Sequence, residues 1–118
     1  DSFWRAPLFD AAVFRAGMVG LGRRDAYGRI AHLLCELFVR LKAVGLTSGR
    51  AYALPITQAE LGDALGLSTV HVNRTLQQLR GDGLIQTQGG TVMVQDWERL
   101  KRAGQFEETY LHLRKEAA

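Results

Sequence analysis

The residues best suited to recognising another molecule lie close together, between positions 68 and 80. In this stretch Val72, Leu76 and Leu79 recur at helical spacing, which predicts the buried face of a helix that Ser68 caps. The same spacing directs a second set of side chains elsewhere: Thr69, Val70, Asn73, Arg74 and Gln77. The guanidinium of Arg74 can donate two hydrogen bonds to guanine, a pairing that contributes about 1–3 kcal/mol of discrimination. The predicted chemistry is therefore hydrogen bonding to base edges, with Thr69 and Val70 suited to touching a thymine methyl group.

The residues before Ser68 predict a shorter helix that packs against this one. Thr57 and Glu60 have the spacing of a capping box, and they open a helix over Gln58–Leu65 that Gly66 ends. This helix is expected to bury Leu61, Ala64 and Leu65, with Gly62 small where the two helices cross. Such a pair forms a helix-turn-helix, whose second helix enters the DNA major groove and brings its first exposed residues to the base edges. Those positions are Ser68, Thr69, Val70, Asn73 and Arg74.

The residues after this motif predict a hairpin and a closing helix. Leu84–Gln88 and Thr91–Val94 flank a Gly89-Gly90 pair that suits a tight hairpin turn, which makes the hairpin the wing of a winged helix. Asp96 is expected to cap the last helix, and its apolar residues fall at helical spacing: Trp97, Leu100, Ala103 and Phe106, with Tyr110, Leu111 and Leu113 beyond. The aromatic residues at this spacing favour a core over a base-stacking platform.

Two helices and a short strand are predicted before the motif. A helix over Ala6–Leu21 carries a narrow apolar stripe that could pack on its own domain or on a second subunit. A second helix, capped by Asp25, faces inward with Ile30, Leu33, Leu34, Leu37, Phe38 and Leu41 and faces water with Arg29, Glu36, Arg40 and Lys42. After Gly45, Ala51–Ile56 suits an edge strand. The predicted fold class is mainly α with a small antiparallel sheet, a winged helix-turn-helix.

The composition narrows the class of protein. A chain of 118 residues with 47% hydrophobic and 23% charged residues is the size of one globular domain. The formal net charge of +3 permits a polyanionic partner, and no apolar run approaches the roughly 20 residues that cross a membrane. The single Cys35 favours a small core residue in a reducing cytoplasm, and neither it nor the surface residue His71 has partners at zinc-ligand spacing. We therefore expect no metal site, and the initial Asp1 suggests a fragment or a processed product.

Four segments together resemble the Crp–Fnr family of bacterial regulators. They are Asp25-Ala-Tyr-Gly-Arg-Ile-Ala, Ile56-Thr-Gln-Ala-Glu-Leu-Gly, Gly66-Leu-Ser-Thr-Val-His-Val-Asn-Arg74 and Gly83-Leu-Ile. The likeness runs from about Asp25 to Val94, and the order and spacing of the pieces are specific together. Members of this family share an N-terminal β-roll sensor, a long central dimerisation helix and a C-terminal winged helix.

The resemblance implies a division of the chain and a set of partners. Residues 1–24 would be the end of the central dimerisation helix and a hinge, and residues 25–118 the winged helix-turn-helix domain with a C-terminal helix. It implies a homodimer on double-stranded DNA, with RNA polymerase as a further partner and no cofactor in this fragment. An effector would bind the missing N-terminal sensor domain. Ungapped counting places Phe14-Arg15 where cyclic-AMP-responsive members carry Thr-Ser, which argues against a cyclic-AMP response.

The resemblance also implies roles for individual residues. Arg74 matches the family's guanine contact, whereas Thr69-Val70 stands where members resembling the catabolite activator carry Arg-Glu, so the target should differ. The positions that bind phosphate in the family are occupied here by Thr57, Gln58, Ser68 and Gln88. Hydroxyls and amides at helix starts and at a wing tip are chemically suited to that contact.

Two other classes of function compete with DNA binding. The first is a winged helix used only for protein association, but such a surface favours aromatic anchors over the polar Thr69, Asn73 and Arg74. The second is an enzyme, for which the sequence offers no nucleophile–base pair, carboxylate pair or glycine-rich phosphate loop. The sequence leaves open the effector, the operator, the target genes and whether binding activates or represses.

Overall fold

The computed structural model describes residues 25–108, in which four helices and three strands follow one another. Predictions that concern residues 1–24 and 109–118 lie outside this range: the helix over 6–21, the Phe14-Arg15 substitution, the assignment of residues 1–24 to a dimerisation helix, and the apolar Tyr110, Leu111 and Leu113. Within the described range no helix is long and apolar enough to cross a membrane.

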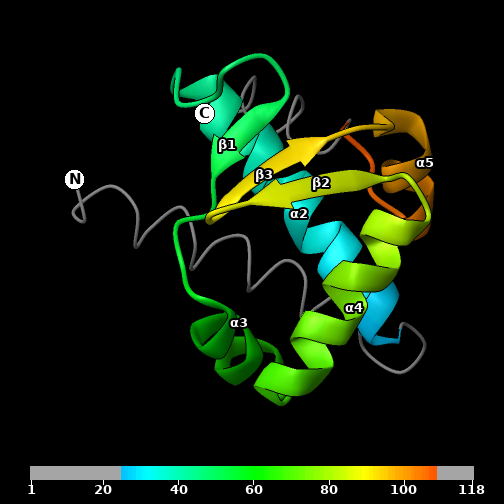
Figure 1. Cartoon of the computed structure of the whole chain (residues 1–118). Helices are drawn as coiled ribbons and strands as arrows, with labels where there is room; N and C mark the ends of the chain where they lie inside the picture. The colour runs from blue at the N-terminus through cyan, green and yellow to red at the C-terminus, as the bar shows by residue number, and fades with distance from the viewer. Residues whose placement is uncertain (1–24, 109–118) are drawn as a thin grey trace.

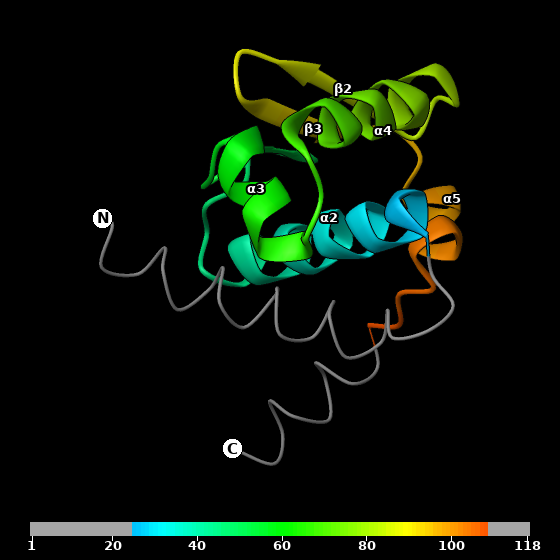
Figure 2. The same ribbon diagram turned by 90° about the horizontal axis from the view of Figure 1, so that it is seen from below.

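Helix α2, Ala26–Ala43, runs through the middle of the molecule (Figures 1 and 2). It begins as predicted, because the Asp25 side chain accepts a hydrogen bond from the Gly28 amide at 2.9 Å. All six apolar side chains that the sequence turned inward are buried. The helix packs against both α4, Thr69–Gly81, and α5, Trp97–Gly104, so it has more than one buried side.

The prediction that Glu36 faces water is wrong, since its side chain is 0% exposed. Its Oε2 accepts a hydrogen bond from Arg40 Nε at 2.8 Å. One turn before it on the same side of α2, His32 Nδ1 donates to the Gly104 carbonyl of α5 at 2.9 Å. The return of α5 across this side of α2 is a contact between distant parts of the chain, which the periodicity of one helix does not reveal.

The sheet has the order β1-β3-β2 and is antiparallel throughout. Strand β1 is Ala51–Ala53, β2 is Ile85–Gln88 and β3 is Thr91–Val94. The edge strand ends earlier than the predicted Ala51–Ile56, because Pro55 has no amide hydrogen with which to continue the pairing. Gly89 and Gly90 form the hairpin turn with φ of 55° and 84°, values that favour glycine. The sheet is tied to α2 by Tyr52, whose hydroxyl donates to the Leu34 carbonyl at 2.9 Å.

Helices α3, Gln58–Leu65, and α4 form the predicted helix-turn-helix. Leu61 and Leu65 are buried, but Ala64 is exposed, which corrects its place in the predicted core. Gly66 ends α3 in the left-handed conformation with φ of 73°. Tyr27 of α2 donates to Asp82 Oδ2 at 2.7 Å just beyond the end of α4. Burial, together with this hydrogen bond, raises the pKa of Tyr27 to about 12.

An aromatic cluster closes the core beside α5, as the sequence predicts. The Phe38 and Trp97 rings meet edge to face with centroids 5.2 Å apart, and the Trp97 and Phe106 centroids are 6.0 Å apart. Cys35 is buried in the same core, and burial raises the pKa of its thiol. The four described helices and the small antiparallel sheet confirm the predicted fold class.

The close crossing of α3 and α4 can be tested at Gly62. A Cβ at this position would meet the Leu67 carbonyl oxygen and lie 3.5 Å from Val72 Cγ2. Gly62→Ala should lower the free energy of unfolding in urea by about 1–3 kcal/mol, despite the higher helix propensity of alanine. The control is Gly81→Ala, because a Cβ on Gly81 meets nothing within 4 Å and should leave stability unchanged or slightly higher. Equal stability of Gly62→Ala and the unsubstituted chain would contradict the close crossing.

Candidate nucleic-acid interface

The N-terminal half of α4 presents the predicted base-contacting side chains to solvent. Thr69, Val70, Asn73 and Arg74 are all exposed, Val70 at 67%. On the opposite side of the helix the predicted Val72, Leu76 and Leu79 are buried, together with Thr75, whose hydroxyl donates to the His71 carbonyl at 2.8 Å. The buried side fixes α4 on the domain, so the exposed side is free to meet a partner.

Ser68 and Thr57 begin the two helices of the motif. The Ser68 hydroxyl accepts from the His71 amide at 3.0 Å. The Thr57 hydroxyl accepts from the Glu60 amide at 3.1 Å, and the Glu60 carboxylate accepts from the Thr57 amide at 2.8 Å, which completes the predicted capping box. Both hydroxyls are exposed and use an oxygen lone pair as caps, so each keeps its own hydrogen for donation to an anion.

A hydrogen-bonded chain of amides joins the two helices. Asn73 Nδ2 donates to Gln58 Oε1 at 3.3 Å, and Asn73 Oδ1 accepts from Gln77 Nε2 at 3.1 Å. The Asn73 amide is therefore held in one orientation between α3 and α4. Each of these bonds uses one of the two lone pairs on Oδ1 or one of the two hydrogens on Nδ2, so the Asn73 amide can still offer an acceptor and a donor to adenine.

A groove of about 360 Å³, which we call the wing groove, separates the helix-turn-helix from the hairpin. Four predicted site residues line it together: Thr57, Gln58, Asn73 and Gln88. The other four predicted residues, Ser68, Thr69, Val70 and Arg74, lie outside its lining on the first turns of α4. The structure thus divides the predicted site into an exposed helix start and a polar groove.

Sequence reasoning missed the part of the groove lining that comes from the C-terminal half of α4, including the polar Gln77 and Arg80. Both follow Asn73 on the same side of α4, at four and seven residues. The helical spacing placed Gln77 away from the core without giving it a role, and no signal within α4 reveals that β2 packs beside its end. In the described range the structure brings together no group of three or more His, Cys, Asp or Glu side chains that could hold a metal ion.

An exposed, capped second helix of a helix-turn-helix, with a β-hairpin beside it, defines a winged helix domain. Comparison with known families gives the particular class. The chain belongs to the family of the Crp-like helix-turn-helix domain, whose model matches residues 28–103.

Similar proteins agree with this membership. The chain is 38% identical over 95 residues to the transcriptional activator protein FnrL of Cereibacter sphaeroides, a match that covers 77% of this chain and 38% of FnrL. The structure of FixK2 from Bradyrhizobium japonicum matches 73% of this chain and 41% of FixK2 with a TM-score of 0.63 and 32% identity. The catabolite activator protein of Thermus thermophilus matches 67% of this chain and 33% of its own with a TM-score of 0.51 and 28% identity.

These comparisons confirm the resemblance to the Crp–Fnr family. The chain spans about two-fifths of the length of FnrL, so the match concerns one part of that protein. The relatives are named as transcriptional activators, which agrees with the prediction that the chain is not an enzyme.

Ser68 has a structural role that can be measured without any ligand. Ser68→Ala removes the oxygen that caps α4 and should lower the free energy of unfolding by about 1 kcal/mol in urea. Thr69→Ala is the matched control, because the neighbouring Thr69 is exposed and alanine favours the helix. A Ser68→Ala variant as stable as Thr69→Ala would contradict the capping role.

Proposed function

We propose that this chain is the sequence-specific DNA-binding domain of a transcription regulator. The observation that carries the proposal is the exposed start of α4, which a buried opposite side fixes on the helix-turn-helix. A helix held in this way enters the major groove with its first residues on the base edges. The family membership and the names of the relatives support the same function.

Arg74 is the principal base reader in this proposal. Its side chain is exposed, and within the described residues it takes part in no ion pair that would have to break on binding. Its planar guanidinium matches the two acceptors of guanine. Thr69 and Val70 contact thymine methyl groups, and Asn73 supplies an amide to a neighbouring base.

Thr57, Gln58, Ser68 and Gln88 bind backbone phosphates. The first three stand at the starts of α3 and α4, where backbone amides and the helix dipole favour an anion. Gln88 ends β2 beside the hairpin turn. These contacts fix the position of the domain on the duplex and carry no sequence information.

The domain acts in a homodimer on a palindromic operator, with half-sites about 34–36 Å apart. Residues 1–24 supply the dimer contact as the end of a central helix. We also propose the cytoplasm as its location and RNA polymerase as a further partner, since the relatives are transcriptional activators. Any effector binds a sensor domain that precedes this segment. The competing role in protein association has less support, because the exposed large hydrophobic residues in the described range include no aromatic anchor: Val44, Leu46, Val70 and Met93.

Selection from random duplexes tests base reading. The unsubstituted chain should enrich a palindrome in a salt-sensitive manner. Arg74→Ala should relax the preference at one guanine of each half-site by about 1–3 kcal/mol. Gln88→Ala should weaken binding to all sequences about equally, since it removes a phosphate contact. The base-reading role is lost if no sequence is enriched and Arg74→Ala leaves binding unaltered at low salt.

Light-scattering mass tests the dimer. The full chain should be a dimer at concentrations where a chain that starts at Asp25 is a monomer, because the contact between subunits is assigned to residues 1–24. DNA binding by the shorter chain should then weaken, since two linked domains benefit from a high effective concentration. Equal monomer masses for the two chains would count against this assignment.

A further inference from the structure

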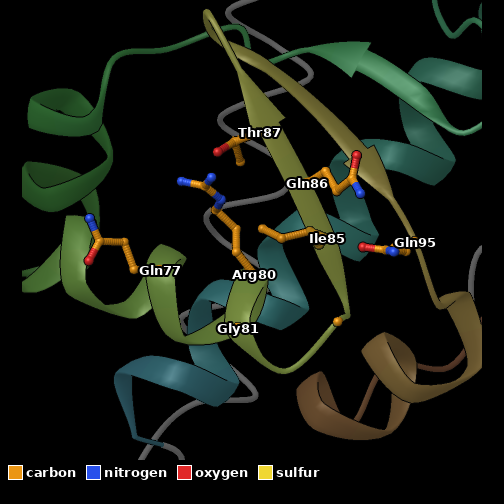
Figure 3. Close-up of a pocket in the computed structure, with 8 residues that line it drawn as sticks. Gln77, Arg80, Gly81, Ile85, Gln86, Thr87 and Gln95 are labelled. Carbon is orange, nitrogen blue, oxygen red and sulfur yellow. The ribbon is translucent and has the colours of Figure 1, made fainter.

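Two hollows meet beside the C-terminal half of α4. The wing groove lies on one side, and a second hollow of about 610 Å³ lies between the end of α4 and β2. Three polar residues line both: Gln77, Arg80 and Thr87. In Figure 3 the Arg80 side chain leaves α4 and extends toward Thr87 on β2, with Gln77 one turn earlier on the helix. None of the three belongs to the predicted DNA contacts.

Among the described residues, the charge of Arg80 is not matched by an acidic side chain. Five of the nine Lys and Arg residues in the range 25–108 have an anionic, carbonyl or aromatic partner: Arg29, Arg40, Lys42, Arg99 and Lys101. The other four form no ion pair among the described residues: Arg50, Arg74, Arg80 and Arg102. Two of these four lie on α4. Among the described residues that line the two hollows, Arg80 is the one charged side chain.

The position of Arg80 suits a phosphate better than a base. It follows Arg74 by six residues, so it lies about 9 Å farther along α4 than the proposed base reader. Along the same stripe Gln77 comes three residues before Arg80, and Gln77 is already tied through Asn73 to Gln58 at the start of α3. A strand of DNA backbone that reaches Thr57 and Gln58 and continues along the wing groove therefore passes Arg80.

The chemistry of the three side chains fits a phosphodiester. A guanidinium presents paired donors that match two phosphate oxygens, and amide and hydroxyl groups can donate further hydrogen bonds. We propose that Arg80, with Thr87 and Gln77, forms a phosphate-binding site for the DNA strand that passes between the recognition helix and the wing. This inference rests on the proposed function and adds a cation to a set of phosphate contacts that is otherwise uncharged. In this proposal the hairpin contributes Thr87 to the phosphate site, in addition to Gln88 beside its turn.

The salt dependence of binding tests this site in the full chain. The probe is the palindromic duplex that the unsubstituted chain selects, with a scrambled duplex beside it. For Arg80→Gln, the slope of log K against log salt should be shallower by about 0.9 per bound domain, with the same loss of affinity on both duplexes. Arg102→Gln is the matched control, because Arg102 is exposed and also forms no ion pair with the residues in the range 25–108. It lies on α5, at the end of the molecule away from the wing turn (Figures 1 and 2). Its slope should not change.

Neutral methylphosphonates locate the contact. A single methylphosphonate is placed at each position of the selected duplex in turn. At one phosphate per half-site it should weaken binding by the unsubstituted chain but leave binding by Arg80→Gln unchanged. Thr87→Val removes the hydroxyl and keeps the shape of the side chain. It should weaken binding to the unmodified duplex and reduce the effect of a methylphosphonate at that same phosphate.

Three outcomes overturn the inference. The first is a salt-dependence slope for Arg80→Gln equal to that of Arg102→Gln. The second is a loss of affinity for Arg80→Gln that depends on the identity of one base pair. If the unsubstituted chain binds no duplex at low salt, the proposed function fails and the phosphate site fails with it. Binding with an unchanged slope defeats the phosphate site alone.

Discussion

Burial of α2 is the constraint on which the DNA-facing surface depends. The helix is covered by α4 on one side and by α5 on another, and the Tyr52 hydroxyl joins it to the sheet. The apolar surface buried in the two helix contacts contributes roughly 25 cal/mol of stability per Å² removed from water. Because this packing buries one side of α4, the helix is fixed with its opposite side facing solvent. The recognition surface is therefore a consequence of the core.

Local chemistry made much of this fold predictable from the sequence. Asp25, Thr57, Ser68 and Asp96 each cap the helix that the sequence assigns to them, since a cap involves only residues within one turn. The hairpin turn followed from Gly89 and Gly90 for the same reason. Glu36 was placed wrongly because α5 returns across α2 from about seventy residues away along the chain. The exposure of Thr69, Val70, Asn73 and Arg74 followed from helical spacing, but the wing groove exists only where β2 packs beside α4.

The amide chain from Gln58 through Asn73 to Gln77 links the two parts of the site. It connects the start of α3, assigned to a phosphate, with the exposed side of α4, assigned to bases. Such side-chain networks are polarised cooperatively, so a donor that binds DNA at one end changes the hydrogen-bonding capacity at the other. In the proposed function, Asn73 therefore couples the phosphate-binding part of the site to the base-contacting part.

The distribution of charge explains how a chain with a net charge of only +3 can bind a polyanion. The four assigned phosphate contacts are uncharged, so they orient the domain by hydrogen bonds and release few counterions. Most cations in the described range are matched internally, and two of the unmatched arginines lie on α4. These two arginines place positive charge along one helix, with Arg74 toward its start and Arg80 near its end. One domain of this kind gains little non-specific affinity, and a two-fold pair doubles the number of such contacts on one duplex. In the homodimer proposed above, pairing is therefore the step through which this weakly charged surface gains affinity and a palindromic target.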